Sequence, residues 1–307
     1  MKNNSLKTRY ENSTRFLKLA ETLIPLGSQT FSKSRTQFPV GVSPLFAKSA
    51  KGCEVIDIDG NKYLDMISSL ASVTLGYDNK QFIDTLKKEM IRAITPSLAT
   101  EIEFEVANKI NKFMPSIERI RFGKTGSDAN AAAIRLARAY TGKKIVLSGG
   151  YHGWHDWYIG STSMNLGVPT EVSKLTHKFA VNNFDEIRHL LLNKFKNKVA
   201  CVILEPISYE VVSKEFLTNL RKLCSKEKTV LIFDEIVTGF RVNSGGAQKY
   251  FNVYPDLTTL GKSLGNGMPI SAIGGRAKIM RLLEKIFFSG THGGERLSLA
   301  AAKVVLN

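Results

Sequence analysis

The sequence predicts an α/β protein with a largely parallel central sheet that helices cover on both faces. From about residue 80, stretches with helical spacing of apolar residues alternate with short, continuous apolar runs. Uninterrupted apolar runs are typical of strands buried on both faces, and such strands occur mainly in parallel sheets flanked by helices. Ligands bind such sheets at the carboxyl ends of the strands, so the residues that follow each run are candidates for a functional site.

The alternation assigns helices and strands in turn. The helices are predicted over residues 80–93, 101–113, 129–140, 185–196 and 215–226. The strands are predicted over residues 120–122, 144–147, 179–181, 201–204, 230–233 and 270–273. A further helical stretch, 298–306, closes the sequence.

The first part of the chain predicts a different organisation. A leading helix is indicated by apolar residues at near-helical spacing over residues 17–24, and a loop follows it. Residues 54–66 alternate apolar and polar side chains around a Gly60-Asn61 turn, which predicts a β-hairpin. We therefore expect an N-terminal helix, loop and hairpin segment over residues 1–79 and a large domain over residues 80–307.

The composition is that of an ordinary globular chain. Of its 307 residues, 43% are hydrophobic and 23% are charged, which excludes a disordered, collagen-like or coiled-coil protein. Lysine and arginine number 43 against 27 aspartate and glutamate residues, a net charge of +16. The basic residues are scattered along the sequence, which favours a lysine-rich surface; nucleic-acid binding is an alternative that rests on net charge alone.

Nothing in the sequence indicates a membrane-bound or secreted protein. No run approaches the roughly 18 consecutive apolar residues of a membrane span, and the polar N-terminus lacks the apolar core of a signal peptide. Three widely spaced cysteines, Cys53, Cys201 and Cys224, suit neither a disulfide framework nor a metal site. We therefore expect a cytoplasmic location.

A glycine-containing turn follows the strand predicted to end at Phe122. Residues 123–130 read Gly-Lys-Thr-Gly-Ser-Asp-Ala-Asn and open a helix. Free backbone N–H groups at a helix N-terminus bind phosphate, and the hydroxyls of Thr125 and Ser127 add polar groups. A capped strand–helix turn without a ligand explains the same residues equally well, and both interpretations stay open.

Two carboxylates and a lysine follow other strands. Asp234 and Glu235 come directly after the strand 230–233, where they suit general acid or base groups, metal ligands or a helix cap. Lys262 lies among glycines and small residues, where its charge is hard to solvate. Such surroundings can make a lysine a nucleophilic amine, and a solvated surface lysine is the alternative.

An aromatic and imidazole cluster, from Tyr151 to Trp157, follows the strand 144–147. Its rings suit stacking on a planar ligand. His152 and His155 have a spacing that suits a metal, but no set of Cys and His residues completes a four-ligand site. We therefore expect stacking and no metal.

Together and in this order, these features resemble the class III aminotransferases, which are pyridoxal-phosphate (PLP) enzymes of fold type I. Within that family the sequence is most similar to the glutamate-1-semialdehyde 2,1-aminomutase branch. The resemblance runs from about residue 11 to the end of the chain. The motifs that carry it are Leu23-Ile-Pro25, Gly60-Asn-Lys-Tyr-Leu-Asp65, 126–129 with 134–138, Tyr151-His-Gly153, Glu205-Pro206, Asp234-Glu235 with 238–241, and 255–262 with Gly275-Arg276.

The resemblance implies PLP as the cofactor and a role for each matching residue. Lys262 would bind the cofactor covalently through its amine and then carry protons between the amine-bearing carbon and the cofactor. Asp234 would pair with the pyridinium nitrogen and keep it protonated. Gly126 and Ser127 would bind the phosphate of the cofactor. Ile236 and Tyr151 would pack on the two faces of its ring.

The resemblance also implies a homodimer with shared active sites. Thr291 matches a threonine that reaches the phosphate from the partner subunit in this family. Glu205 matches a glutamate close to cofactor and substrate. Lys33 stands where the aminomutase has an arginine that binds the substrate carboxylate; lysine attracts such a group only as a point charge, without the bidentate fork of arginine.

The implied fold and function are those of a PLP enzyme that moves an amino group. We expect the large domain of fold type I, with the C-terminal small domain of the family largely missing. The expected reaction converts glutamate 1-semialdehyde to 5-aminolevulinate. The glycines usual soon after Glu205-Pro206 are absent here. Amino transfer to another amino or keto substrate is the alternative, as is an inactive truncated remnant.

Overall fold

The computed structural model describes residues 9–307, and the chain forms two compact units, Met1–Ile83 and Asp84–Asn307. The expectation that the N-terminus lacks a signal core falls partly on residues 1–8, which lie outside the described residues. The elements of the N-terminal unit are α2 (Glu11–Ala20), η1 (Pro25–Gly27), η2 (Phe31–Lys33), β1 (Ala47–Lys51), β2 (Glu54–Asp57), β3 (Lys62–Leu64) and α3 (Ser68–Ala71).

The N-terminal unit contains the predicted hairpin. Its three strands form an antiparallel sheet in the order β1-β2-β3, with Val55 of β2 opposite Tyr63 of β3. The turn is closed by Asp57, whose Oδ1 accepts hydrogen bonds from the backbone N–H groups of Asp59 (3.0 Å) and Asn61 (2.8 Å). Aspartate and asparagine favour turns because their short side chains bond to nearby backbone.

The second unit holds the large sheet and its helices. Helix α4 (Lys80–Met90) crosses the boundary between the units. The strands are β4 (Arg119–Gly123), β5 (Ile145–Gly149), β6 (Thr176–Lys178), β7 (Val199–Leu204), β8 (Val230–Glu235), β9 (Leu257–Leu260) and β10 (Ser271–Gly275). The helices are α5 (Glu101–Phe113), α6 (Gly126–Thr141), α7 (Asp156–Ile159), α8 (Thr170–Ser173), α9 (Phe184–His189), η3 (Leu190–Lys194), α10 (Lys214–Lys226), α11 (Gly246–Phe251), η4 (Lys262–Gly265), α12 (Ala277–Met280), η5 (Arg281–Glu284) and α13 (Arg296–Val305).

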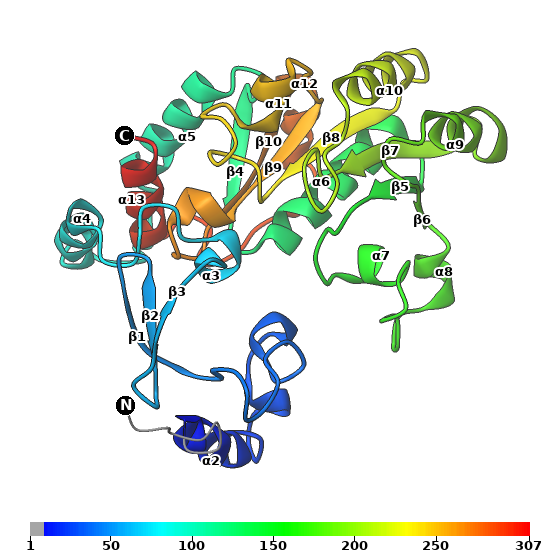
Figure 1. Ribbon diagram of the computed structural model, residues 1–307. Coiled ribbons are helices and arrows are strands. Elements are labelled where there is room, and N and C mark those ends of the chain that lie inside the picture. Colours follow the sequence, from blue (N-terminus) through cyan, green and yellow to red (C-terminus); the bar gives the residue numbers. More distant parts are fainter. Residues whose placement is uncertain (1–8) are drawn as a thin grey trace. The chain divides into compact units, whose positions relative to one another are not determined.

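The large sheet is mostly parallel, as the sequence predicts. Its strand order is β4-β10-β9-β8-β7-β5-β6 (Figure 1). All neighbouring strands pair in parallel except β10, which runs antiparallel to both β4 and β9. The register places Leu204 of β7 opposite Phe233 of β8, and Asp234 of β8 opposite Thr259 of β9. The ends of β7, β8 and β9 therefore meet at one edge.

Helices cover both faces of this sheet. Alternate residues of β8 enter different cores, because successive side chains of a strand point to opposite faces. Leu231 and Phe233 pack with residues of α9, α10 and α11, whereas Val230 and Ile232 pack with residues of α6, α7 and α12. Helices α5 and α13 form a third core with β9 and β10.

Most of the predicted helices and strands of the large domain are confirmed, and the clearest differences concern two strands and one helix. The predicted strand 179–181 is wrong: the strand is Thr176–Lys178, which lies at the sheet edge and so needs no continuous apolar run. Strand β9 was not predicted, because two of its four buried residues are threonines. The predicted helix 185–196 ends earlier, as α9 followed by a π-helix, η3.

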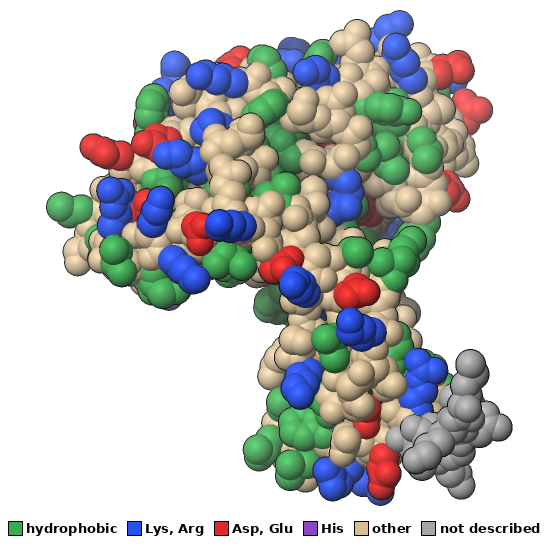
Figure 2. Space-filling view, turned by 60° about the vertical axis from the view of Figure 1, so that its left-hand side comes forward, with side chains coloured by type: hydrophobic (Ala, Val, Ile, Leu, Met, Phe, Trp, Pro, Cys, Tyr) green, Lys and Arg blue, Asp and Glu red, His purple; other side chains and the backbone are tan. Residues whose placement is uncertain are grey.

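The surface of the chain is rich in basic residues. Figure 2 shows Lys and Arg side chains spread over the face in view, with Asp and Glu side chains among them. This distribution agrees with the lysine-rich surface that the scattered charges predict. Among the described residues, no helix has both the length and the apolar character needed to cross a membrane.

Candidate functional site

Four residues of the large unit that were predicted to bind cofactor or substrate lie at the carboxyl ends of parallel strands. Tyr151 follows β5 by two residues, and Glu205 comes directly after β7. Asp234 lies near the end of β8, and Lys262 follows β9 by two residues. Parallel strands bring their carboxyl ends to one edge, so these four residues share the part of the sheet where ligands bind in this class of fold.

Asp234 is a buried carboxylate held by several donors. It is 3% exposed. Its Oδ2 accepts a hydrogen bond from Asn130 Nδ2 at 2.8 Å and lies 2.7 Å from His152 Nδ1. Because a carboxylate only accepts, we assign the proton to Nδ1 of that histidine. The backbone N–H of Ile236 donates to Oδ1 at 3.1 Å. These contacts fix the orientation of the carboxylate.

Asn130 and Thr259 complete this network and leave one acceptor position open. The Thr259 hydroxyl lies 2.7 Å from Asn130 Oδ1 and 3.3 Å from Asp234 Oδ1. A hydroxyl carries one proton, which the shorter contact assigns to Asn130. Asp234 Oδ1 then accepts only from the backbone of Ile236 among the described residues. A carboxylate oxygen accepts two hydrogen bonds, so Oδ1 retains a position for an N–H donor.

Lys262 has the surroundings of a reactive amine. Burial lowers its pKa below the usual lysine range; the carboxylates of Asp234 and Glu205 oppose this by raising the pKa, and Arg241 lowers it further. Its backbone has a φ of +40°, which is uncommon for a residue with a side chain and is typical of functional sites. The structure therefore places a desolvated amine close enough to Asp234 and Glu205 for both carboxylates to affect its pKa.

The lowered pKa of Lys262 has a consequence for cofactor capture. Only the neutral amine attacks an aldehyde, and a lowered pKa makes the neutral form abundant at lower pH. The rate of PLP attachment to cofactor-free protein should therefore rise with pH to a midpoint below that of a free lysine amine. Absorbance-monitored mixing at a series of pH values measures it, with Nα-acetyl-lysine as the reference. A midpoint equal to that of the reference would contradict the assignment.

The turn after β4 is built to present backbone donors. Thr125 caps α6: its hydroxyl accepts from Asp128 N (3.2 Å), and the Asp128 side chain accepts from Thr125 N (2.8 Å). This capping box uses the third N–H of the helix. Within the described residues the N–H groups of Gly126 and Ser127 have no recorded partner, so they remain for an anion at the positive end of the helix dipole.

Gly153 packs directly against this turn. It has a φ of +97°, and a Cβ added to it would overlap Ser127 Oγ. The adjacent N–H of Trp154 donates to the same Ser127 Oγ at 3.3 Å. The glycine is therefore required both by the backbone conformation and by the close approach of the two loops.

The change Gly153→Ala should destabilise the fold by about 1–3 kcal/mol and weaken PLP binding, because the new methyl group displaces Ser127. Gly167→Ala is the matched control: its φ is +86°, but a Cβ there meets nothing within 4 Å. The control should cost about 1 kcal/mol of unfolding free energy and leave PLP affinity unchanged. Equal PLP affinity in the two variants would argue against a phosphate site at Ser127.

Ile236, Tyr151 and Glu205 surround the space between the turn and Lys262. A Cβ added at Gly126 or Gly261 would lie 3.2 or 3.1 Å from side-chain carbons of Ile236. Tyr151 is 60% exposed, so its ring is free to cover a ligand. Its backbone N–H donates to Glu205 Oε2 at 2.8 Å. Burial raises the pKa of Glu205, while the hydrogen bond from Tyr151 lowers it.

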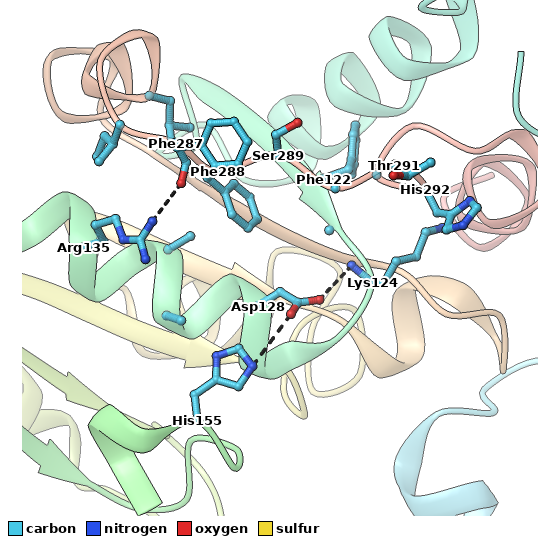
Figure 3. Close-up of a pocket in the computed structure, with 17 residues that line it drawn as sticks. Phe122, Lys124, Asp128, Arg135, His155, Phe287, Phe288, Ser289, Thr291 and His292 are labelled. Carbon is cyan, nitrogen blue, oxygen red and sulfur yellow. Dashed lines mark hydrogen bonds and ion pairs between the residues drawn. The ribbon is translucent and has the colours of Figure 1, made fainter. Parts of the chain in front are cut away.

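Of the remaining predicted residues, Thr291 lies outside this group of the large unit, and Lys33 belongs to the N-terminal unit. Thr291 is exposed and lines a cavity of about 490 Å³ together with Lys124 and Asp128 (Figure 3). Neither Gly126 nor Ser127 lines that cavity. Lys33 is an exposed residue at the end of η2 in the N-terminal unit. The roles of Thr291 and Lys33 therefore stay predictions.

The structure separates the two adjacent carboxylates, which the local residue pattern alone leaves equivalent. Glu235 is fully buried and points away from the network of Asp234. It accepts hydrogen bonds from the backbone N–H groups of Ala247 and Gln248, from Gln248 Nε2 and from the Thr238 hydroxyl. Glu235 therefore anchors the loop that follows β8 to the start of α11.

Reasoning from sequence did not predict that three residues of the site contact Asp234. Asn130, His152 and Thr259 hold Asp234, yet each belongs to a different element. His152 and Asn130 lie inside motifs that were recognised for other reasons, so their position was a usable signal. Thr259 carried none, because a threonine in a short strand is an ordinary residue.

Comparison with known proteins identifies the family of the chain. The family model described as "Aminotransferase class-III" matches residues 37–307. A glutamate-1-semialdehyde 2,1-aminomutase of Francisella philomiragia is 40% identical over 276 residues, covering 84% of this chain and 64% of that protein. Another, from Alkaliphilus oremlandii, is 38% identical over 314 residues, covering 96% of this chain and 73% of that protein.

The fold is also shared with solved structures. The FumI protein of Sphingopyxis sp. MTA144, solved in its PLP internal aldimine form, superposes with a TM-score of 0.89 at 26% identity. The match covers 97% of this chain and 72% of that one. The chain spans less than two thirds of the length of the Francisella relative. On the family match and these identities, the chain belongs to the class III aminotransferase family.

Proposed function

We propose that the protein catalyses PLP-dependent transfer of an amino group, and that its reaction is the conversion of glutamate 1-semialdehyde to 5-aminolevulinate. The observation that carries the proposal is the desolvated amine of Lys262 beside the carboxylates of Asp234 and Glu205. The choice of reaction is supported by relatives at 38–40% identity that bear the aminomutase name. Class III aminotransfer between two molecules is the alternative, and the family match supports it.

The residues present fit PLP. Asp234 Oδ1 has an acceptor position left for the N–H of a pyridinium ring, because Thr259 donates to Asn130 instead. The N–H groups of Gly126 and Ser127 are oriented for a phosphate at the start of α6. A pyridine ring and a phosphate group are the two recognition features of this cofactor, and the site offers one matching group to each.

Each residue contributes a separate part of the mechanism. When bound, PLP supplies an electron-accepting ring that stabilises negative charge at the amine-bearing carbon of the substrate. Asp234 would pair with the ring nitrogen and keep it protonated. Lys262 would hold the cofactor through its amine, and the same amine would remove and return protons at the reacting carbon of the substrate. Tyr151 and Ile236 would cover the two ring faces and exclude water.

Substrate and partner contacts complete the proposal. Glu205 would lie beside cofactor and substrate, and Lys33 would attract the substrate carboxylate. Thr291 would donate to the phosphate of a second copy of the chain, which makes the functional form a homodimer. We place the protein in the cytoplasm, because its three cysteines form no disulfide.

The reaction is tested by supplying glutamate 1-semialdehyde to PLP-loaded protein without any amino donor. An aminomutase carries its amino group within one molecule, so we expect 5-aminolevulinate to form under these conditions. The product is measured by its condensation to a coloured pyrrole. Turnover only after a second amino acid is added would assign the protein to intermolecular aminotransfer. Absence of both reactions, with PLP still attached at Lys262, would overturn the proposed function.

A further inference from the structure

A second cavity lies at the amino-terminal ends of the parallel strands of the large sheet. It has a volume of about 1010 Å³ and includes Thr229 and Val230, where β8 begins, and Asp256, which precedes β9. The predicted cofactor residues follow the other ends of these strands. β8 is six residues long, which corresponds to about 17 Å from one end to the other. The cavity is therefore distinct from the cofactor site.

The lining of this cavity is strongly basic. It carries a net charge of +4, because six cations face two carboxylates across residues that are distant in sequence. The charged lining residues are Lys143, Arg221, Lys226, Glu227, Lys228, Asp256, Arg276 and Lys278. Concave surfaces lined by one sign of charge focus the electrostatic potential, because their low-dielectric walls replace screening water.

One carboxylate of the lining is already neutralised. Asp256 is 6% exposed, and its Oδ2 accepts from Arg221 Nη1 at 2.8 Å and from Leu231 N at 2.9 Å. Its Oδ1 lies 3.2 Å from Arg276 Nε. Two guanidinium groups thus share a single carboxylate, which fixes both of them on the wall of the cavity and leaves an excess of positive charge there.

The lysines of the lining come from the two segments that carry the arginines and from the segment before β5. Lys143 donates to the carbonyl oxygens of Glu227 at 3.0 Å and Lys228 at 3.5 Å, which holds its amine at the carboxyl end of α10. Lys278 lies over the ring of Tyr140, with Nζ 5.7 Å from the ring centroid. Lys226 and Lys228 are exposed. Of these, only Lys143 is held in place by hydrogen bonds to carbonyl groups.

An ordinary solvated lysine surface does not account for this arrangement. Lysines on an open surface spread apart, because like charges repel one another. Here cations from three separate segments converge on one hollow, and the lining carboxylate not shared by arginines is Glu227. A multiply charged anion would remove the mutual repulsion of these groups, and the cavity is large enough for a nucleotide-sized ligand.

We propose that this cavity binds the di- or triphosphate group of a small anion, with Lys226, Lys228 and Lys278 as its direct contacts. The arginines paired with Asp256 form the fixed wall behind them. The same phosphate chemistry occurs in inorganic polyphosphate and in nucleoside triphosphates. The shared group, rather than the base, is the recognised feature.

The test titrates PLP-saturated protein with tripolyphosphate in a calorimeter at constant ionic strength. Saturating PLP keeps the phosphate site at α6 filled, and its visible absorbance shows that it stays bound. We expect saturable binding of one tripolyphosphate per chain. ATP in a parallel titration distinguishes the sources: equal affinity assigns recognition to the phosphates, and tighter binding of ATP assigns a contribution to the nucleoside.

A triple variant, Lys226→Gln, Lys228→Gln and Lys278→Gln, should weaken tripolyphosphate binding about tenfold or more. The matched control is Lys214→Gln, Lys222→Gln and Lys249→Gln, which removes the same charge from exposed lysines outside the cavity. The single change Lys278→Gln provides a milder variant if the triple one folds poorly. Equal weakening in both triples, or no binding by the unchanged protein, would overturn the proposal. So would a single-stranded RNA that binds more tightly than tripolyphosphate.

Discussion

Replacing Lys262 with alanine should abolish covalent attachment of PLP and lower kcat by about 10⁴-fold or more. The amine of this residue is the only group of the site placed both to bind an aldehyde and to move protons beside Asp234 and Glu205. Borohydride treatment followed by peptide mass spectrometry should find the trapped cofactor on residue 262 in the unchanged protein. The variant should show no trapped cofactor at all.

The control for this prediction is Lys249→Ala, an exposed lysine on α11. It should keep both the trapped adduct and the activity, since it removes the same amine from a position outside the site. Lys262→Ala should also remain folded, because it removes a partly buried charge whose largest cost is desolvation. A trapped adduct on any other lysine, or full activity of Lys262→Ala, would refute the assignment.

The positions of Asp234 and Glu205 could be predicted because each follows a recognisable strand. Asp234 comes after four consecutive apolar residues, and Glu205 follows another such run. A parallel sheet brings strand ends together whatever the intervening sequence, so the clustering followed from topology alone. Lys262 was predictable for a different reason: the glycines around it signal tight backbone.

The contacts that orient these residues could not be predicted in the same way. Asn130, His152 and Thr259 meet around Asp234 from three elements, and no local pattern encodes which side chains face each other. The separate roles of Asp234 and Glu235 follow from their pointing to opposite faces of β8. The sequence shows that the two side chains point to opposite faces, but not which residues pack on each face.

The basic cavity is a similar case. Its cations are spread over residues 143–278, and in the sequence they are indistinguishable from other scattered lysines. Only the return of the chain to the amino-terminal ends of β8 and β9 places them together. Net charge predicts a basic surface but does not indicate where basic side chains cluster.

The two adjacent carboxylates of β8 provide the sharpest test of how the site works. Asp234→Asn keeps the size of the side chain but removes the charge that pairs with the ring nitrogen. It should lower kcat about 10³-fold and shift the visible absorbance of bound PLP. The unfolding free energy should fall by only about 1 kcal/mol, because an amide can still accept from Asn130 and His152.

Glu235→Gln should show the reverse pattern. Each oxygen of Glu235 accepts from at least one N–H group, which an amide NH₂ group in its place would oppose, so the change should cost about 2–3 kcal/mol of unfolding free energy. The kcat of the folded fraction should stay within a few-fold of the unchanged protein, because Glu235 does not contact the Asp234 network. Chemical denaturation and steady-state kinetics measure the two quantities separately. Asp234→Asn should mainly lower kcat, and Glu235→Gln should mainly lower the unfolding free energy. If both variants lost activity equally at equal stability, the assignment of Asp234 to the cofactor and of Glu235 to the loop would be wrong.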